Sequence, residues 1–281
     1  MINNVNVEKK LISVITVCLN AEKEIGFTID SVLKQDYTNY EYLIKEGGSD
    51  DSTIEIAEKY INRFSEKNIP FRIISEKDEG LYDAMNQSAQ YAKGEWIIYI
   101  NAGDELFDNK VLSLLSSEIS DQYDILYGDA VLTENEKYKL LKAGCLERFK
   151  YTNPICHQAS LTRTDIIRKN LFDKRYFIAS DFDLFLRLYL LNDKRFKKPD
   201  IVFCVYRLGG VSNSRVFQRE KEFNTSRKIN GLKRVAFPHL QIMRIVFVEK
   251  IRKAAIIILG KGFYSENRGW YSDKYKASQE K

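Results

Sequence analysis

Carboxylates that follow hydrophobic runs are the residues best placed to do chemistry in this 281-residue chain. Asp104 follows the run EWIIYI after three residues, Asp78 follows FRIIS, and Glu46 ends YEYLIKE. A lone carboxylate in such a place can hold a divalent cation, because Mg²⁺ is commonly bound by one or two protein carboxylates with water and phosphate oxygens as the other ligands. The competing interpretation is that Asp104 only caps a following helix.

The elements that must position these carboxylates alternate between strand and helix patterns over the first 130 residues. We predict strands at 11–19, 40–46, 71–75 and 95–100, and helices between them whose apolar residues recur at helical spacing. Repeated β-α units indicate an α/β fold with a mostly parallel sheet and helices on both faces. Ligands of such sheets bind beyond the carboxyl ends of the strands, so we expect the polar segments at those ends to converge on one edge.

After residue 129 the pattern is less regular. Two short runs, YDILYGDAVL and ASLTR, are typical of strands, 181–191 is predicted to be an apolar-rich helix, and DIVFCVYRL is a further strand. A Gly-Gly-Val-Ser turn and a basic helical stretch follow. This half of the chain cannot be assigned to simple β-α units.

The net charge of +5 is unevenly distributed. Residues 219–281 hold 15 Lys and Arg against 6 Asp and Glu, which leaves 29 basic and 33 acidic residues in the preceding part. A basic tail on an acidic body indicates an anionic partner, which could be a membrane surface, nucleic acid or another protein, and a solvated basic helix is the simpler alternative.

Several classes of site lack support in the sequence. The 4 Cys show no C-x-x-C spacing, the 2 His make a zinc site improbable, and no dinucleotide fingerprint, Walker loop or G-x-S-x-G elbow is present. Isolated thiols suit a reducing compartment. The N-terminal residues lack the apolar core of a signal peptide, and the apolar runs are shorter than a membrane span. We therefore expect a cytoplasmic protein that is soluble or lies on a membrane.

Four motifs in order resemble one family. SVITVCLNAEKEIGFTIDSVLKQDY, EYLIKEGGSDDST, SEKDEGLYDAMNQSAQYAKGEWIIYINAGDEL and ASDFDLFLRL are similar to family-two glycosyltransferases of the GT-A fold, closest to bacterial enzymes that build colanic acid, capsule or O-antigen polysaccharides. The resemblance covers about residues 11–215. It implies a catalytic domain at 1–215, with a nucleotide-sugar half at about 11–130, an acceptor half at about 131–215, and a basic helical extension at 216–281.

The resemblance also implies a donor site. Side chains from four segments match positions that bind the nucleotide sugar: Thr16, Val17, Asn20, Glu46, Asp51, Asp78, Asp83, Asn86 and Asn101. Glu46 replaces the commoner Asp, and Met85 stands where many members have Arg. These departures leave the base open, with UDP favoured.

The family's metal motif is reduced to N-x-G-D in this chain, so only Asp104 matches the carboxylate that coordinates Mn²⁺ or Mg²⁺. Asp181 matches the family's catalytic base. An inverting transfer needs a carboxylate that faces the acceptor hydroxyl, opposite the departing diphosphate. Asp183 is a competing base, Asp181 could instead be a helix N-cap, and Arg187 is expected to be a structural ion-pair partner.

His157 lies in a segment that resembles the family's acceptor side, and Gly209 and Gly210 could form a loop that closes over the diphosphate. A structural histidine and a plain turn are the alternatives. Residues 240–259 are predicted to be a helix with an apolar stripe and basic residues elsewhere, and such a helix suits an anionic membrane surface. Packing against the core or a partner subunit remains open.

The resemblance therefore predicts a metal-dependent, hexosyltransferase-type enzyme on the inner face of the cell membrane. It would move a sugar from a nucleotide-diphosphate donor to a hydroxyl of a lipid-linked or oligosaccharide acceptor, with inversion. Nucleic acid fits poorly because the body is acidic, and oligomer formation is left open. The alternatives are an inactive relative that serves as a membrane-associated scaffold and a sugar nucleotidyltransferase, although no Gly-rich phosphate loop is present.

Overall fold

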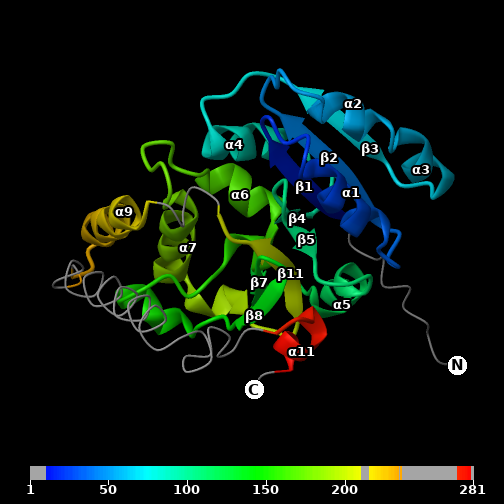
Figure 1. Cartoon of the computed structure of the whole chain (residues 1–281). Coiled ribbons are helices and arrows are strands. Elements are labelled where there is room, and N and C mark those ends of the chain that lie inside the picture. The colour runs from blue at the N-terminus through cyan, green and yellow to red at the C-terminus, as the bar shows by residue number, and fades with distance from the viewer. Residues whose placement is uncertain (1–10, 210–214, 234, 236–270, 280–281) are drawn as a thin grey trace, which may run out of the picture.

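The computed structural model describes residues 11–209, 215–233, 235 and 271–279, which form two sheets and the helices around them (Figure 1). The larger sheet runs in the spatial order β10-β6-β9-β4-β1-β2-β3. Its strands are β1 (Ile12–Cys18), β2 (Tyr40–Glu46), β3 (Phe71–Ser75), β4 (Trp96–Tyr99), β6 (Ile125–Tyr127), β9 (Ser160–Arg163) and β10 (Phe196–Lys197). The smaller sheet contains β5 (Glu105–Leu106), β11 (Val202–Arg207), β7 (Asp129–Glu134) and β8 (Lys137–Leu141), in that spatial order.

The larger sheet is mostly parallel, as predicted. Strand β1 pairs in parallel with β2 and β4, β2 with β3, and β10 with β6, whereas β9 is antiparallel to both of its neighbours. The helices and helical turns that follow or flank these strands are α1 (Ile25–Leu33), α2 (Thr53–Glu58), α3 (Ile61–Glu66), α4 (Leu81–Tyr91), α5 (Val111–Glu118), η1 (Leu146–Lys150), η2 (His157–Ala159), α6 (Thr164–Asn170), α7 (Ser180–Leu191), η3 (Asp193–Arg195), α9 (Val216–Ile229) and α11 (Lys274–Ser278).

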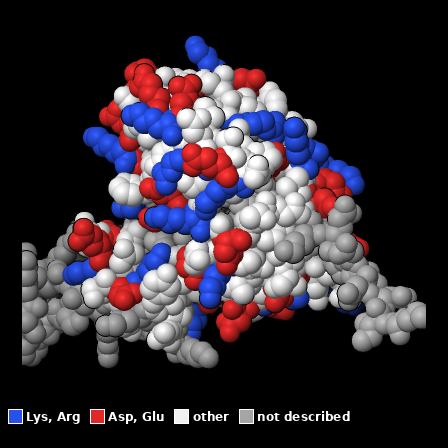
Figure 2. Space-filling model, turned by 90° about the vertical axis from the view of Figure 1, so that its right-hand side faces the viewer, with Lys and Arg blue, Asp and Glu red and all other residues white. Residues whose placement is uncertain are grey.

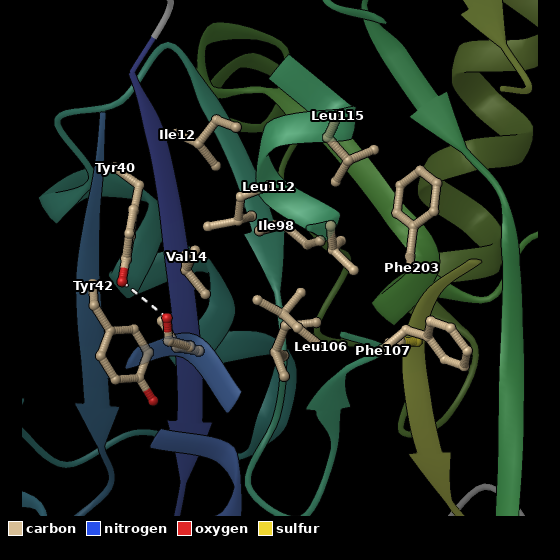
Figure 3. Packing of buried hydrophobic residues seen from close by; sticks show 14 of the residues in the cluster. Ile12, Val14, Tyr40, Tyr42, Ile98, Leu106, Phe107, Leu112, Leu115 and Phe203 are labelled. Carbon is tan, nitrogen blue, oxygen red and sulfur yellow. Dashed lines mark hydrogen bonds between the residues drawn. The ribbon is translucent and has the colours of Figure 1, made fainter. Parts of the chain in front are cut away.

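Successive side chains of the central strands pack into two hydrophobic cores on opposite faces of the sheet. Ile12 and Val14 face a core shared with α1, α5 and the smaller sheet, where Leu112 and Phe203 also lie (Figure 3). Ile15 and Val17 point to the opposite face, which packs against α4 and α7. A strand with both faces covered is expected to be continuously apolar, and that explains the unbroken hydrophobic run of β1.

One predicted helix is divided in two. The stripe from residue 54 to 64 predicts a single helix, but a turn at Lys59 and Tyr60 separates α2 from α3. Ala57 and Phe64 are both buried in the same core, so the apolar stripe continues through the turn. Periodicity alone therefore could not reveal the break.

At the amino ends of the strands, a buried carboxylate ties three of them together. Glu41 on β2 accepts hydrogen bonds from the Ser13 hydroxyl at 2.6 Å, from Arg72 Nη2 at 2.9 Å, and from the N–H groups of Lys93 and Gly94. Burial opposes the charge of Glu41, yet these donors hold its pKa below the ordinary value. A Cβ on Gly94 would lie 2.5 Å from the Ser13 nitrogen, so this junction requires glycine.

The described part of the basic extension packs against the rest of the protein. Helix α9 contacts α7, and α11 contacts β8 and β7. Tyr271 forms an antiparallel bridge with Tyr138, with both N–H···O distances at 2.7 Å. On the face shown in Figure 2, basic and acidic side chains lie intermixed. The predicted helix at 240–259 lies outside the described residues.

Candidate active site

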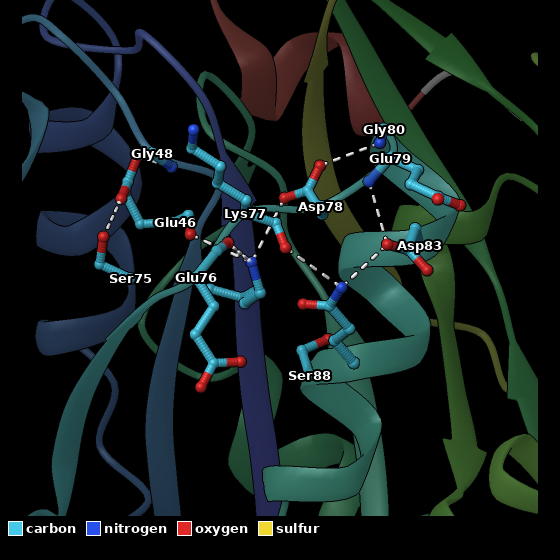
Figure 4. Close-up of polar contacts among 12 residues, drawn as sticks. Glu46, Gly48, Ser75, Glu76, Lys77, Asp78, Glu79, Gly80, Asp83 and Ser88 are labelled. Carbon is cyan, nitrogen blue, oxygen red and sulfur yellow. Dashed lines mark hydrogen bonds and ion pairs between the residues drawn. The ribbon is translucent and has the colours of Figure 1, made fainter.

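The loops at the carboxyl ends of β2 and β3 lie beside each other, and the loop after β3 leads into the start of α4 (Figure 4). Glu46 is fully buried there. Its Oε1 accepts from the N–H groups of Gly48 and Ser49, and its Oε2 accepts from the Ser75 hydroxyl at 2.6 Å. Burial would raise the pKa of Glu46, but the bonds from Ser49 and Ser75 lower it. The carboxylate thus organises the 47–51 loop, and its predicted contact with a base stays a prediction.

Asp78 is held at this edge by a buried lysine that the sequence analysis missed. Lys45 Nζ lies 3.3 Å from Asp78 Oδ2 and also donates to the carbonyls of Glu46 and Glu76. The N–H of Gly80 donates to Asp78 Oδ1 at 2.9 Å. A Cβ on Gly47 would lie 2.7 Å from Asp78 Oδ2, so a larger residue at position 47 would displace this carboxylate. The signal was present, because a lysine inside the buried run YEYLIKE needs a partner.

The other predicted donor-site residues also bond within the protein. Asp83 accepts from the Glu79 N–H and from Lys174, and both ends of the Asn86 amide pair with the Phe172 backbone. The Thr16 hydroxyl is buried and donates to the Ile100 carbonyl, and Val17 lies in the core. Asn20 accepts from the Asp50 N–H, and Asp51 accepts from the Glu22 N–H. These contacts show how the edge is built, and contact of each residue with a donor stays a prediction.

A second group of predicted residues shares one cavity of about 770 Å³. Asn101 and Asp104 from the loop after β4, His157 from η2 and Asp181 from α7 all line it. Gly209, with a φ of +111°, lines the same cavity, and Gly210 lies outside the described residues. The structure therefore brings together the proposed metal ligand and the proposed base, which are far apart in the sequence.

Asp181 lies in the first turn of α7 and is 8% exposed. The Tyr82 hydroxyl is 3.1 Å from its Oδ1, and His157 Nδ1 is 3.3 Å from its Oδ2. The N-cap of α7 is Ala179, so the alternative that Asp181 serves as the N-cap is wrong. Its carboxylate is instead held at the cavity wall by two side chains from other elements.

His157 connects the two sides of the cavity. Its Nε2 is 3.1 Å from Asn101 Nδ2, and its Nδ1 faces Asp181. If the Asn101 amide donates to Nε2, the proton of the neutral ring resides on Nδ1 and points to Asp181. Burial would lower the pKa of His157, but the hydrogen bond and the charge of Asp181 raise it. The ring therefore links the loop after β4 to Asp181.

Asp183, the competing base, does not reach this cavity. Its Oδ2 accepts from Arg187 Nε at 2.8 Å, and its Oδ1 accepts from the Ser226 hydroxyl at 2.7 Å and from Asn230. It lines a separate pocket with Arg187 and Tyr176. The prediction of Asp183 on the acceptor side is wrong because two residues further along a helix turn the side chain away from Asp181. Arg187 is confirmed as its ion-pair partner.

Asp104 is 5% exposed and precedes β5 instead of a helix, so the capping interpretation is wrong here too. Gln158 Nε2 donates to its Oδ2 at 2.9 Å and the Arg207 N–H donates to its Oδ1 at 3.0 Å. Burial raises the pKa of Asp104 to about 6, although these two donors act in the opposite direction. Gln158 and Arg207 were not predicted, because η2 and β11 meet this loop only through tertiary structure.

The residues present fit a cation that takes most of its ligands from outside the protein. Among the described residues, no cluster of three or more His, Cys, Asp and Glu side chains could hold a metal ion. The cavity offers the Asp104 carboxylate, which has lone pairs beyond the two already used. It also offers the Asn101 Oδ1 atom, which is buried without a hydrogen-bond partner in the described structure. Such a sparse set suits Mg²⁺ or Mn²⁺ bound together with phosphate oxygens.

Comparison with known proteins places this site in context. The pattern for "Glycosyl transferase family 2" matches residues 13–190. A PGL/p-HBAD biosynthesis glycosyltransferase of Mycobacterium bovis is 28% identical over 217 residues, which are 76% of this chain and 82% of that protein. The Escherichia coli enzyme WfgD, a UDP-Glc:alpha-D-GlcNAc-diphosphoundecaprenol beta-1,3-glucosyltransferase, is 31% identical over 126 residues, covering 44% of this chain and 47% of its own.

Solved structures share the fold. The S. aureus TarS 1-349 structure in complex with UDP superposes with a TM-score of 0.60 at 20% identity, covering 76% of this chain and 64% of TarS. The Pyrobaculum calidifontis mannosyltransferase PcManGT, in complex with GDP-Man and Mn2+, has a TM-score of 0.61 at 14% identity, covering 82% and 67%. These similarities confirm the GT-A type of fold, and the match over 13–190 shows that the chain belongs to glycosyl transferase family 2.

Proposed function

We propose that this chain transfers a sugar, with inversion, from a nucleotide-diphosphate donor to a hydroxyl group of a lipid-linked glycan in bacterial surface polysaccharide synthesis. The observation that carries the proposal is the single cavity lined by Asn101, Asp104, His157 and Asp181. We favour a UDP-sugar as the donor, because the name of WfgD specifies UDP-Glc and the TarS structure contains UDP. WfgD's diphosphoundecaprenol acceptor supports a lipid-linked acceptor here.

In this mechanism Asp181 accepts the proton of the acceptor hydroxyl while that oxygen bonds to the sugar's anomeric carbon. The bond from that carbon to the diphosphate breaks on the opposite face, and the bonding electrons leave with the nucleotide diphosphate. Because the donor bond ionises early, a weak carboxylate base suffices. Tyr82 and His157 hold Asp181 toward the cavity.

Asp104, with Asn101 beside it, would hold Mn²⁺ or Mg²⁺. When bound, the cation would neutralise charge on the leaving diphosphate. PcManGT carries Mn²⁺ with its nucleotide sugar, which supports a divalent cation without deciding between the two metals. The donor's nucleotide would occupy the edge built by Glu46, Asp78 and their neighbours.

Thermal-shift measurements with UDP, GDP, dTDP and CMP, each with and without Mn²⁺, test the donor class. We expect the largest stabilisation with UDP and Mn²⁺ together, since a ligand that binds only the folded state raises the midpoint. Transfer from UDP-sugars to a diphosphoundecaprenol-linked sugar is then followed by NMR of the product, which reports inversion. No stabilisation by any nucleotide would contradict the proposal.

The same assays separate the alternatives. Slow metal-dependent hydrolysis of a UDP-sugar would exclude a catalytically inactive scaffold. Release of pyrophosphate from UTP and a sugar phosphate would instead indicate a sugar nucleotidyltransferase. The cavity between Asp104 and Asp181 favours transfer, because a base opposite a leaving diphosphate is what transfer requires.

We also propose that the enzyme works peripherally on the inner face of the cell membrane. The support is the basic composition of residues 219–281, since basic residues near an anionic leaflet contribute about 1 kcal/mol each. No helix in the part of the chain that the structure describes is long and apolar enough to cross a membrane. Co-sedimentation with anionic vesicles, compared with neutral ones, tests this placement.

A further inference from the structure

Helix α9 lies beyond the segment matched to the family, yet it packs on the helix that carries Asp181. The rings of Phe223 on α9 and Phe182 on α7 have centroids 4.3 Å apart. The buried Arg227 guanidinium lies 5.0 Å from the Phe182 ring centroid and donates to the Phe149 carbonyl at 2.9 Å. These contacts fix α9 against α7 directly beside the proposed base.

One α9 side chain reaches the start of α7. Glu222 Oε2 accepts hydrogen bonds from the N–H of Ile178 at 2.8 Å and from the N–H of Ala179 at 3.0 Å. Gln218 Nε2 donates to Glu222 Oε1 at 2.9 Å. The N-cap residue Ala179 has no side chain that could cap the helix. Glu222 therefore supplies a carboxylate where a helix start favours negative charge.

The peptide group between Ile178 and Ala179 is held from both sides. Its N–H donates to Glu222, and its carbonyl accepts from the Tyr82 hydroxyl at 2.5 Å. That same hydroxyl lies 3.1 Å from Asp181 Oδ1. A tyrosine hydroxyl has only one proton to donate. The orientation of this peptide therefore affects whether the Tyr82 hydroxyl donates to the Ile178 carbonyl or to the Asp181 carboxylate.

We propose that Glu222 is a positioning residue for Asp181. It acts through the 178–179 peptide and Tyr82, so the C-terminal extension completes the active site. The inference rests on the proposed function, in which Asp181 is the base, and it adds a requirement that the family-matched segment does not contain. Its essential feature is the reach of the Glu222 oxygen, which must span from α9 to two amide groups.

Two conservative variants separate reach from charge. Glu222→Gln keeps an oxygen at the same distance without the charge, and Glu222→Asp keeps the charge but withdraws the oxygen by one methylene group. We expect kcat within about threefold of wild type for Glu222→Gln and a 10- to 100-fold fall for Glu222→Asp, since small misplacements of a catalytic group are costly. The donor KM should stay within twofold in both. Thr225→Ala, at an exposed position of the same helix, is the control and should match wild type.

Hydrogen exchange of the 176–184 segment gives a readout that does not need activity. Faster exchange at Ile178 and Ala179 is expected in Glu222→Asp, and protection like that of wild type in Glu222→Gln and Thr225→Ala. Equal kcat in Glu222→Asp and wild type, or a larger loss in Glu222→Gln than in Glu222→Asp, would overturn the proposal. If the wild-type protein transferred no sugar, the proposed function would fail, and unchanged exchange in Glu222→Asp would still refute the contact on its own.

Discussion

Two buried carboxylates at opposite ends of the central sheet, Glu41 and Asp104, are held in opposite ways. At the amino end, Glu41 receives hydrogen bonds from a hydroxyl, a guanidinium and two N–H groups, and its pKa is lowered. At the carboxyl end, Asp104 receives two donors, and burial raises its pKa to about 6. Near it, Asn101 Oδ1 is buried without a partner in the described structure.

The difference separates a structural carboxylate from one poised for a ligand. Every oxygen of the Glu41 carboxylate accepts a hydrogen bond from the protein, and these bonds join neighbouring strands. Burial makes the charged form of Asp104 unfavourable in free energy. Carboxylates with shifted pKa values that line a cavity are typical of functional sites. A ligand with positive charge, such as a divalent cation, would offset that unfavourable free energy. The comparison thus predicts that changes at the carboxyl end affect activity and changes at the amino end affect folding.

The largest effect is expected for Asp181→Asn. Removing the base should lower kcat about 1000-fold, within the range usual for general-base catalysis, while binding of UDP with Mn²⁺ stays unchanged. Single-turnover transfer assays and calorimetry measure the two quantities. The matched control is Asp183→Asn on the same helix, which should lose stability through its contacts with Arg187 and Ser226 and retain most activity. Full activity in Asp181→Asn would exclude Asp181 as the base.

Asp104→Ala should lower activity about 100-fold, the size of effect found when one electrostatic contact to a developing charge is removed. The loss should be accompanied by a higher Mn²⁺ concentration for half-maximal rate. Metal titrations of wild type and variant after EDTA treatment provide the measurement. Wild-type activity that persisted in EDTA would contradict the proposed cation. The charge of the leaving diphosphate would then have to be neutralised by basic side chains such as Arg207.

Much of the fold of residues 11–130 could be predicted from the sequence. The strands at 40–46 and 71–75 were predicted with the observed bounds, because both are short runs rich in aromatic and aliphatic residues that are followed by glycine or a charged residue. The convergence of polar segments at one edge also followed, since parallel strands place their carboxyl ends together. Local patterns were sufficient wherever one β-α unit follows another.

The part of the chain after residue 130 could not be predicted to the same depth. Glu222, Gln158 and Arg207 act through contacts between elements 43 to 103 residues apart in sequence, and no local spacing records such contacts. Asp181 and Asp183 look alike in the sequence, but helical geometry points one into the cavity and the other toward α9. The motif match ranked Asp181 above Asp183, and the tertiary structure shows that Asp181 lines the cavity with Asp104 whereas Asp183 lines a separate pocket.

At the other end of the sheet, Glu41→Gln should destabilise the fold by about 2 kcal/mol, because it weakens a buried, charge-assisted network. Activity per folded molecule should change less than twofold. Urea unfolding followed by circular dichroism gives the free energy of unfolding. A fall of more than twofold in activity per folded molecule would contradict the assignment of Glu41 to a purely structural role. Arg72→Met, which deletes one donor to Glu41, should produce a smaller loss of the same kind.

The pH dependence of stability compares the two ends most directly. Glu41 has a lowered pKa in the folded protein. Its contribution to the free energy of unfolding is therefore present at pH values above its ordinary pKa, and it is lost as the pH falls through the folded pKa. Asp104 has a raised pKa of about 6 instead of 3.8, so the folded protein keeps a proton that the unfolded chain has already released. Its contribution is therefore present below pH 3.8 and is lost as the pH rises through about 6.

The two variants should change opposite limbs of the stability profile. In urea titrations with EDTA, Glu41→Gln should flatten the acid limb, and Asp104→Asn should remove a decline of at most about 1.4 kcal/mol per pH unit between pH 4 and about 6. The double variant should show both changes added, because the residues lie at opposite ends of the sheet and share no hydrogen-bond partner. Flattening of the same limb by both variants would mean that the two carboxylates are not held in opposite ways. Mn²⁺ with UDP should restore stability above pH 6 in wild type and not in Asp104→Asn, since a bound cation favours the charged carboxylate.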